Sequence, residues 1–203
     1  MDRYADDLAE LIETLDLNDA ALVGHSTGGG GGPLHRAARD RAGRQGRAAG
    51  RGAAADAADG GRSGGDSEGR LRQDPRGRGG GPLAVLLGVS ESFYSFNRPG
   101  AAPSEGVRRA FWMWSMQAGL KGAYDCVAQF SETDFTEDLR RIDVPTLVAH
   151  GDEDQIVPIG ASAQRTAQFV KDATLKVYPG APHGLVDDFE KAFNDDLLNF
   201  LRG

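Results

Sequence analysis

The chain has 203 residues, a formal net charge of -7 at pH 7, 39% hydrophobic residues and one cysteine, Cys126. This length predicts a single domain with a buried core, and the acidic balance argues against a protein that binds nucleic acid through a uniformly basic surface. One cysteine cannot form an intramolecular disulfide, no apolar run is long enough for a membrane span, and the acidic first twenty residues differ from a secretory signal, so we expect a cytoplasmic protein.

The composition changes abruptly in a Gly- and Arg-rich middle segment. Residues 28–88 hold 19 of the 29 Gly and 11 Arg, but no Phe, Trp or Tyr. A segment of this kind lacks the large apolar side chains that form a core. We therefore expect residues 31–89 to be disordered between an N-terminal part (1–30), cap-like helices (90–142) and a C-terminal part (143–203).

Apolar periodicity predicts the elements on both sides of this segment. Apolar residues spaced by three and four predict an amphipathic helix over residues 4–15, and the apolar run 20–23 predicts a short buried strand. Residues 104–130 are expected to form two helices that separate near residues 119–122. The large apolar side chains at 111–116 favour a cap helix and core over a cofactor site.

The C-terminal part alternates strands with helices. We expect strands at 146–149 and 175–178 and a helix at 159–170. The apolar stripe of a last helix consists of Val186, Phe189, Phe193, Leu197 and Phe200. Strands that alternate with helices favour an α/β fold, in which a parallel sheet is covered by helices on both faces.

The sequence Gly24-His25-Ser26-Thr27-Gly28 follows the first predicted strand directly. A G-x-S-x-G between a strand and a helix is typical of a nucleophile elbow, a sharp turn that holds the serine in a strained conformation and exposes its hydroxyl. A Cβ at either glycine would be expected to collide with the turn. The alternative is a Gly-rich loop that contains a serine by chance, and the five residues alone do not decide between the two.

Two polar clusters follow later predicted strands. The sequence HGDED (150–154) comes after the strand at 146–149, and APHG (181–184) comes after the strand at 175–178. The carboxyl ends of parallel strands are where sites assemble, and the order Ser26, Asp154, His183 is the chain order of a hydrolase triad on this fold. His183 would take the proton of Ser26, and Asp154 would fix the imidazole tautomer. Taken singly, a turn histidine and a solvated loop acid are the simpler interpretations.

Four strings carry a family resemblance: LVGHSTGGG, SFNRPGA, YDCVAQFSETDFTEDLRRIDVPTLVAHGDEDQIVP and LKVYPGAPHGL. They resemble the cofactor-free haloperoxidases and aryl esterases of the α/β-hydrolase fold, often named non-haem chloroperoxidases. The resemblance covers residues 1 to about 30 and 90–203.

The resemblance implies a role for each candidate site residue. It makes Ser26 the nucleophile, Asp154 the triad acid and His183 the base. The backbone N–H of Thr27 would be one oxyanion donor, with Asp152 and Glu153 as supporting loop residues. It implies an acyl-serine ester that is resolved by water or by hydrogen peroxide, without haem, metal or other cofactor. The partners would be small molecules, either an ester or a carboxylic acid with peroxide.

The sequence also departs from this family. Its members begin with further strands, including a His-Gly loop that supplies a second oxyanion donor, so the chain resembles an N-terminally truncated member. Residues 30–89 resemble no part of the family, yet the codons of residues 32–40 and 81–87, displaced by one base, can spell family-like sequence. We therefore hypothesise a frame-shifted middle, which a resequenced locus without a compensating pair of insertions and deletions would refute.

These departures leave alternatives open. We expect low or absent esterase activity for the chain as written, and the alternative function is a catalytically inactive remnant that keeps the triad residues. The Arg-Gly middle could be an arm for anionic partners such as RNA, although it lacks aromatic residues for stacking. The set His150, Asp152, Asp154 and His183 could be drawn as metal ligands, but its spacing is a weak signal. A homo-oligomer is compatible with the sequence.

Overall fold

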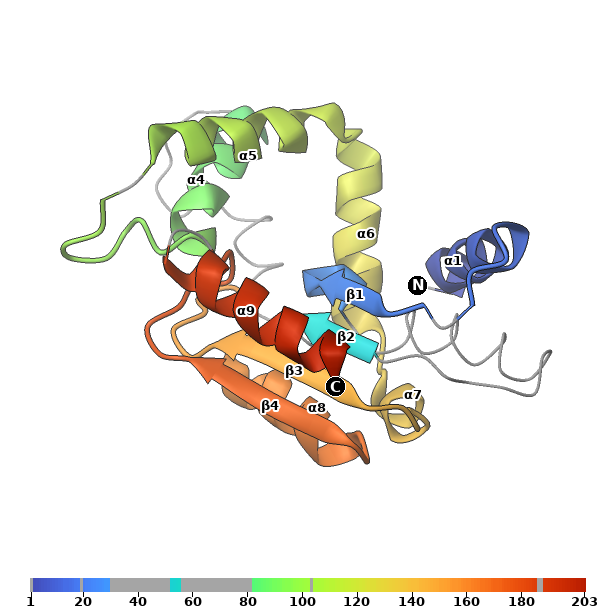
Figure 1. Ribbon diagram of the computed structural model, residues 1–203. Coiled ribbons are helices and arrows are strands. Elements are labelled where there is room, and N and C mark those ends of the chain that lie inside the picture. Colours follow the sequence, from blue (N-terminus) through green and yellow to red (C-terminus); the bar gives the residue numbers. More distant parts are fainter. Residues whose placement is uncertain (1, 19, 30–51, 56–81, 103, 186–187) are drawn as a thin grey trace.

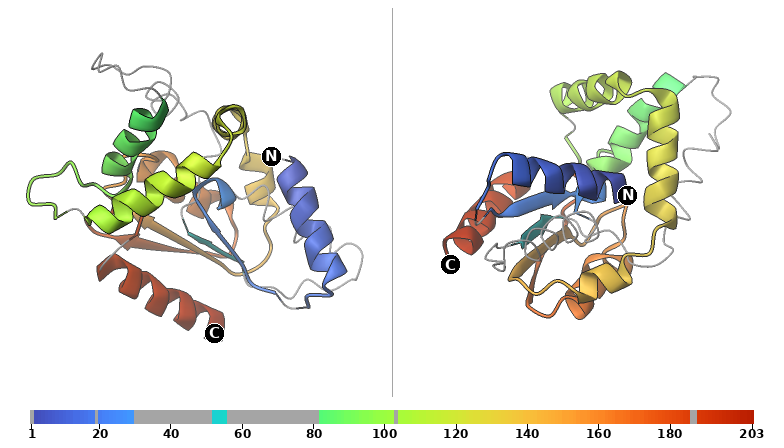
Figure 2. Two further views of the ribbon diagram at one scale, coloured as in Figure 1. Left: turned by 90° about the horizontal axis from the view of Figure 1, so that it is seen from above. Right: turned by 90° about the vertical axis from the view of Figure 1, so that its right-hand side faces the viewer.

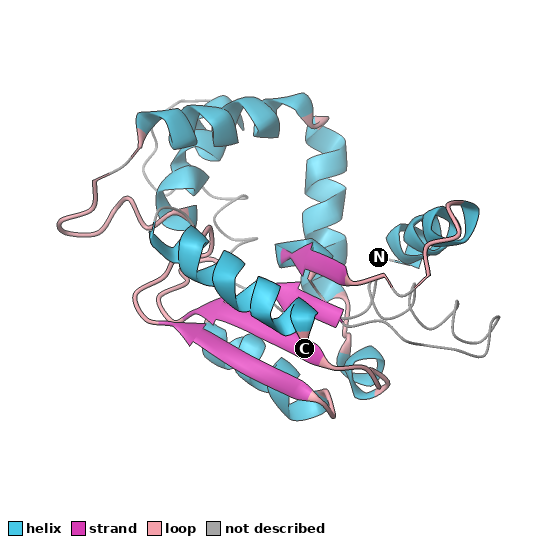
Figure 3. Cartoon of the chain, in the orientation of Figure 1, coloured by secondary structure: helices cyan, strands magenta, loops and turns pink. Residues whose placement is uncertain are grey.

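Among the described residues, four strands form one parallel sheet, in the order β1 (Leu22–His25), β2 (Gly52–Ala55), β3 (Thr146–Gly151) and β4 (Ala173–Tyr178). The computed structural model describes residues 2–18, 20–29, 52–55, 82–102, 104–185 and 188–203. All four strands point the same way (Figures 1 and 3). Their carboxyl ends therefore meet at one edge of the sheet, as the alternation of strands and helices predicts.

The strand β2 differs from the expectation that residues 31–89 stay outside the fold. Gly52–Ala55 pair with Leu22–His25 on one side and with the start of β3 on the other. Backbone N–H and C=O groups make these bonds, so a run of Gly and Ala can fill a central position without large side chains. Residues 30–51 and 56–81, which include most of the segment expected to be disordered and frame-shifted, lie outside the described residues.

Successive residues of β3 form the two halves of the core. Val148 packs with Ala163 of α8 (Ala163–Phe169), which follows the short 3-10 helix η2 (Ile159–Ala161). Ala149 packs with Tyr178 and with side chains of α9 (Asp188–Arg202). Because neighbouring residues of a strand point to opposite faces, one helix covers each face. Figure 1 accordingly shows α9 in front of the sheet and α8 behind it.

The helix α1 (Asp2–Thr14) confirms the first expected helix but buries only part of its apolar face. Ala5 and Ile12 are buried, whereas Tyr4, Leu11 and Leu15 are exposed. The hydroxyl of Tyr4 lies 3.1 Å from Cys126 Sγ, which connects α1 to the helix α6 (Leu120–Glu132). The N-terminal helix is therefore amphipathic as predicted, with a partly uncovered apolar stripe.

Helices between the second and third strands form an arch over the sheet (Figures 1 and 2). They are α4 (Pro82–Phe93), α5 (Glu105–Gln117) and α6 (Leu120–Glu132), whereas the short α7 (Thr136–Arg140) lies outside the arch and contacts α8. Ser104 caps α5 by accepting a hydrogen bond from the Val107 N–H. Two helices form here as predicted, but they separate at residues 118–119, and residues 120–122 of the predicted break begin α6. Among the described residues no helix is long and apolar enough to cross a membrane.

The large apolar residues of α5 do not all enter the core. Phe111 lies 5.0 Å from Phe93, ring centre to ring centre, but Met113 and Trp114 are 58% and 67% exposed. Because a helix turns by about 100° per residue, a run of consecutive large residues cannot face one side. Only part of the run therefore contributes to packing.

Candidate active site

Ser26 lies at the turn where β1 ends. Its φ is 54°, in the left-handed region that residues with a Cβ rarely adopt. Ser26 also begins a single 3-10 turn, η1 (Ser26–Gly28). Such a conformation costs free energy and persists only where the surrounding structure imposes it. The strained serine expected of a nucleophile elbow is therefore present.

The two glycines of the motif differ in their surroundings. A Cβ on Gly24 would lie 2.2 Å from the carbonyl oxygen of Gly28, a distance that no rotamer change can relieve. A Cβ on Gly28 would meet no heavy atom within 4 Å among the described residues. The steric reason for glycine is thus confirmed at Gly24, and at Gly28 the described part of the chain does not show one.

Asp154 is buried in the loop after β3. Its Oδ1 accepts hydrogen bonds from the backbone N–H groups of Ile156 (2.7 Å) and Val157 (2.8 Å). Burial alone would disfavour a carboxylate, but donors directed at the oxygen stabilise the charged form. The loop therefore provides an acid that can remain ionised while hidden from water.

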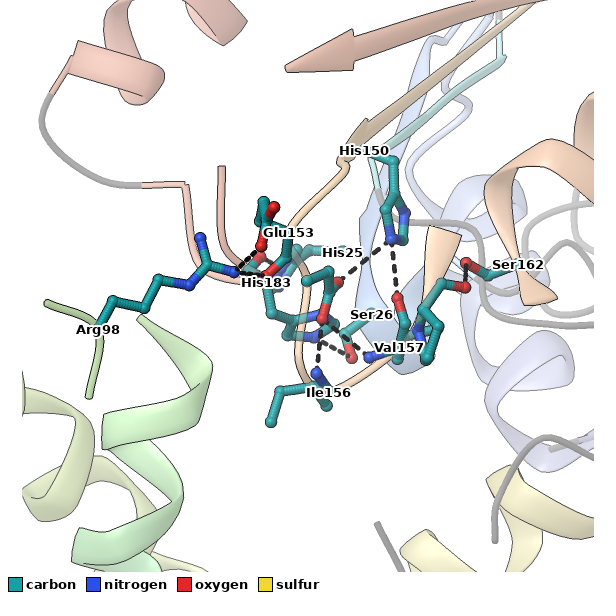
Figure 4. A network of polar contacts seen from close by, with 11 residues as sticks. His25, Ser26, Arg98, His150, Glu153, Ile156, Val157, Ser162 and His183 are labelled. Carbon is teal, nitrogen blue, oxygen red and sulfur yellow. Dashed lines mark hydrogen bonds and ion pairs between the residues drawn. The ribbon is translucent and has the colours of Figure 1, made fainter. Parts of the chain in front are cut away.

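His183 lies in the loop after β4 and connects the other two residues (Figure 4). Its Nδ1 is 2.7 Å from Asp154 Oδ2, and its Nε2 is 3.0 Å from Ser26 Oγ. A carboxylate only accepts hydrogen bonds, so Nδ1 carries the proton and Nε2 is left to accept the proton of the Ser26 hydroxyl. The structure brings together the three residues that the sequence singled out from separate strands.

The loop that carries His183 is held from two directions. Gly180 turns it with a φ of 77°, and the Gly180 N–H donates to Asp152 Oδ1 at 2.7 Å. On the other side, the Gly184 N–H donates to the carbonyl oxygen of Phe93 at 2.9 Å. Asp152 thus supports the histidine loop, and the end of α4 fixes its position against the cap.

Two aromatic neighbours of His183 were not predicted from the sequence. The ring of Phe93 lies 4.7 Å from the imidazole at 83°, an edge-to-face contact. The His25 ring lies 5.1 Å away, and its Nε2 is 3.2 Å from the His183 carbonyl oxygen, so this nitrogen carries a proton. His25 stands next to Ser26 in the motif, which is the one signal that could have drawn attention to it.

The segment after α4 contacts the residues beside Asp154. Arg98 donates to the carbonyl oxygen and carboxylate of Glu153, and Gln155 bonds to Asn97 and to the Ser95 hydroxyl. Ser95 is buried and has a φ of 55°, a second strained serine. The string SFNRPGA, noted in the sequence without a role, includes the residues that make these contacts.

The residues that could be drawn as metal ligands make other contacts. Asp154 bonds to His183 and Asp152 bonds to the Gly180 N–H. Within the described ranges, no group of three or more His, Cys, Asp or Glu side chains is placed to hold a metal ion. The structure instead shows an imidazole that contacts a serine hydroxyl on one side and a buried carboxylate on the other.

A parallel sheet with a strained serine after its first strand, and with a carboxylate and a histidine after later strands, defines an α/β hydrolase. The chain matches the alpha/beta hydrolase family over residues 1–196 and belongs to it.

Relatives of this chain are named as a haloperoxidase and as an esterase/perhydrolase. The chain is 41% identical to the non-heme haloperoxidase of Rhodococcus erythropolis, over 99% of this chain and 74% of that protein. It is 38% identical to the bifunctional esterase/perhydrolase DCH of Acinetobacter calcoaceticus, over 100% of this chain and 74% of that protein. Among solved structures, the bromoperoxidase of Bacillus anthracis superposes with a TM-score of 0.79 at 28% identity, over 100% of this chain and 74% of that chain.

Proposed function

We propose that the protein is a serine hydrolase that acts on carboxylic esters, with Ser26 as nucleophile, His183 as general base and Asp154 as the acid that orients the base. The observation that carries this proposal is the pair of contacts made by His183. Its Nε2 lies 3.0 Å from Ser26 Oγ, and its Nδ1 lies 2.7 Å from Asp154 Oδ2. A serine hydroxyl is a weak nucleophile unless a neighbouring base removes its proton. His183 has the geometry and the tautomer for that step.

The reaction follows from these positions. Ser26 Oγ attacks the ester carbonyl carbon while its proton passes to His183 Nε2, and Asp154 stabilises the imidazolium. The tetrahedral intermediate collapses when His183 returns that proton to the leaving alcohol, which leaves an acyl-serine ester on Ser26. Water, deprotonated by His183, then attacks this ester, and His183 returns the proton to Ser26 Oγ as the carboxylic acid leaves.

Hydrogen peroxide is the second acceptor that we propose for the acyl group. Attack by peroxide instead of water would release a peracid, and a carboxylic acid with peroxide would then serve as substrates. The relative from Acinetobacter calcoaceticus is named an esterase/perhydrolase, which supports this pairing of activities. Neither acceptor needs a cofactor, because the bond changes involve only proton transfer and acyl exchange.

The oxyanion of the tetrahedral intermediate needs hydrogen-bond donors. We assign one of them to the backbone N–H of Thr27, the residue after the nucleophile, which lies in the η1 turn. Backbone donors after a nucleophile elbow are positioned by the turn itself, and losing one donor of this kind typically costs about two to three powers of ten in rate.

The apolar surface near His183 supports esters with apolar acyl or aryl groups. Phe93, Tyr94 and Phe111 are half-buried and in mutual ring contact, with Phe93 against the imidazole. Burial raises the pKa of Tyr94, so its phenol stays neutral near the site. A neutral aromatic surface suits an apolar group better than a charged one.

Labelling with a fluorophosphonate probe, together with hydrolysis of a p-nitrophenyl ester, tests the proposal. We expect the folded chain to be labelled at Ser26, and Ser26→Ala and heat-denatured samples to remain unlabelled. Ester turnover should disappear in the same variant. A folded preparation that is neither labelled nor active would refute the proposal and favour an inactive remnant that keeps the triad residues.

A further inference from the structure

His150 is a buried histidine that the proposed reaction does not use. It lies near the end of β3, and the side chains of His150 and Asp154 are both 0% exposed. His150 Nε2 is 3.2 Å from Asp154 Oδ2 and 2.9 Å from the carbonyl oxygen of Val157 (Figure 4).

These two distances fix the protonation of the His150 nitrogen. A carboxylate oxygen and a carbonyl oxygen both accept hydrogen bonds and donate none. Nε2 of His150 therefore carries a proton, which it donates to the Val157 carbonyl oxygen while lying 3.2 Å from Asp154 Oδ2. Asp154 Oδ2 thus faces two imidazole N–H groups, one from His183 and one from His150.

Polar groups therefore surround both oxygens of Asp154. Its Oδ1 accepts hydrogen bonds from the N–H groups of Ile156 and Val157, its Oδ2 accepts one from His183, and His150 Nε2 lies 3.2 Å from the same Oδ2. A carboxylate has about four favourable positions for donors, so Asp154 can accommodate each of these neighbours. Three of these donors belong to β3 or to its loop, and one belongs to the proposed base.

We propose that His150 is a positioning residue for Asp154, an inference that rests on the proposed function of the triad. The two backbone donors hold Oδ1, and His150 holds Oδ2 in the orientation that meets His183. The same N–H also binds the Val157 carbonyl, so His150 attaches the acid loop to the end of a buried strand. Its effect on the reaction passes through the Asp154–His183 bond.

Four variants separate positioning from packing. His150→Leu removes the donor at similar volume, whereas His150→Gln retains an N–H donor at about the reach of Nε2. His150→Asn is polar but too short to place its donor there. Val148→Ala is the matched control, because Val148 is fully buried on the same strand and contacts the α8 side of the core.

The first readout is the rate at which a fluorophosphonate labels Ser26. We expect His150→Leu and His150→Asn to be labelled about tenfold more slowly, the effect expected from losing one hydrogen bond to a charged group. His150→Gln should recover most of the rate. Val148→Ala should lower the Tm but keep the rate at temperatures where it is folded.

The second readout does not depend on turnover. The proton between His183 Nδ1 and Asp154 should give a low-field proton NMR signal, assigned by its loss in His183→Gln. We expect this signal to move or vanish in His150→Leu and to persist in His150→Gln. If the parent chain is not labelled but shows this pattern, the proposed function fails while the positioning role stands.

Folded variants decide the inference. If His150→Leu matches the parent in labelling rate and in this signal, the inference is overturned. If His150→Leu does not fold, His150→Gln and His150→Asn decide it: equal rates and equal signals in these two folded variants would overturn it.

Discussion

The guanidinium of Arg98 lies 2.6 Å from the backbone carbonyl oxygen of Glu153 and 2.6 Å from its carboxylate. Glu153 directly precedes Asp154, and Gln155 on the other side exchanges two amide hydrogen bonds with Asn97, each 3.0 Å long. Both chain neighbours of the buried acid are therefore held by the segment after α4. Hydrogen bonds on both sides of Asp154 therefore join the acid loop to the segment after α4.

Replacing Arg98 should weaken this connection. We expect Arg98→Ala to lower the free energy of unfolding by about 1 to 2 kcal/mol and to slow ester turnover severalfold, because it removes bonds to carbonyl oxygens as well as a partly screened ion pair. Urea unfolding and p-nitrophenyl ester kinetics measure the two effects. Arg109→Ala removes a solvent-exposed pair with Glu105 and should change stability by less than about 0.5 kcal/mol. Equal effects of the two variants would contradict the role of Arg98.

The turn at Ser26 should not accept a side chain at Gly24. A Cβ there would lie 2.2 Å from a backbone oxygen, so Gly24→Ala must displace the turn. We expect this variant to lose fluorophosphonate labelling of Ser26. Gly106→Ala is the control, because the nearest atom to its Cβ would be 3.7 Å away, and it should be labelled like the parent. Normal labelling of Gly24→Ala would show that the elbow is not rigid.

Local patterns in the sequence predict which three side chains the structure brings together. The motif around Ser26 and the polar residues after two strands predict the three side chains, because parallel strands bring their carboxyl ends to one edge. The structure places these side chains within hydrogen-bonding distance of one another. The C-terminal strands and helices also lie close to the ranges expected from periodicity.

Contacts between distant segments could not be predicted from local patterns in the sequence. The strand Gly52–Ala55 has no apolar pattern, since its place depends on backbone bonds offered by β1 and β3. The support that Arg98 and His150 give to the acid loop depends on tertiary packing, and no spacing along the chain predicts it. Periodicity likewise gave α1 an apolar face but not which part of that face is covered.

Replacing Asp154 by Asn tests the role of its charge while keeping the size of the side chain. Asp154→Asn retains the shape, but its amide can present an N–H where His183 Nδ1–H needs an acceptor, which favours the wrong tautomer. We expect the turnover number for an ester to fall by about three to four powers of ten with the fold retained. Asp152→Asn is the control, because its amide oxygen can still accept from the Gly180 N–H, and it should keep most of the activity. A small effect of Asp154→Asn, measured with burst and steady-state kinetics, would remove Asp154 from the proposed mechanism.

Tyr178 should make the protein less stable at alkaline pH. Burial, followed by a hydrogen bond of 2.9 Å to Asp196, raises the pKa of its phenol above the ordinary value of 10.0. Above about pH 10 the unfolded chain loses this proton while the folded chain keeps it, so the free energy of unfolding falls as pH rises, by at most about 1.4 kcal/mol per pH unit. Tyr178→Phe has no proton to lose and should show a shallower decline between about pH 9 and 11. Urea unfolding across that range measures both slopes, and because a lost hydrogen bond also lowers stability at neutral pH, the slope is the deciding quantity. Parallel curves for the two proteins would show that Tyr178 does not carry the alkaline dependence.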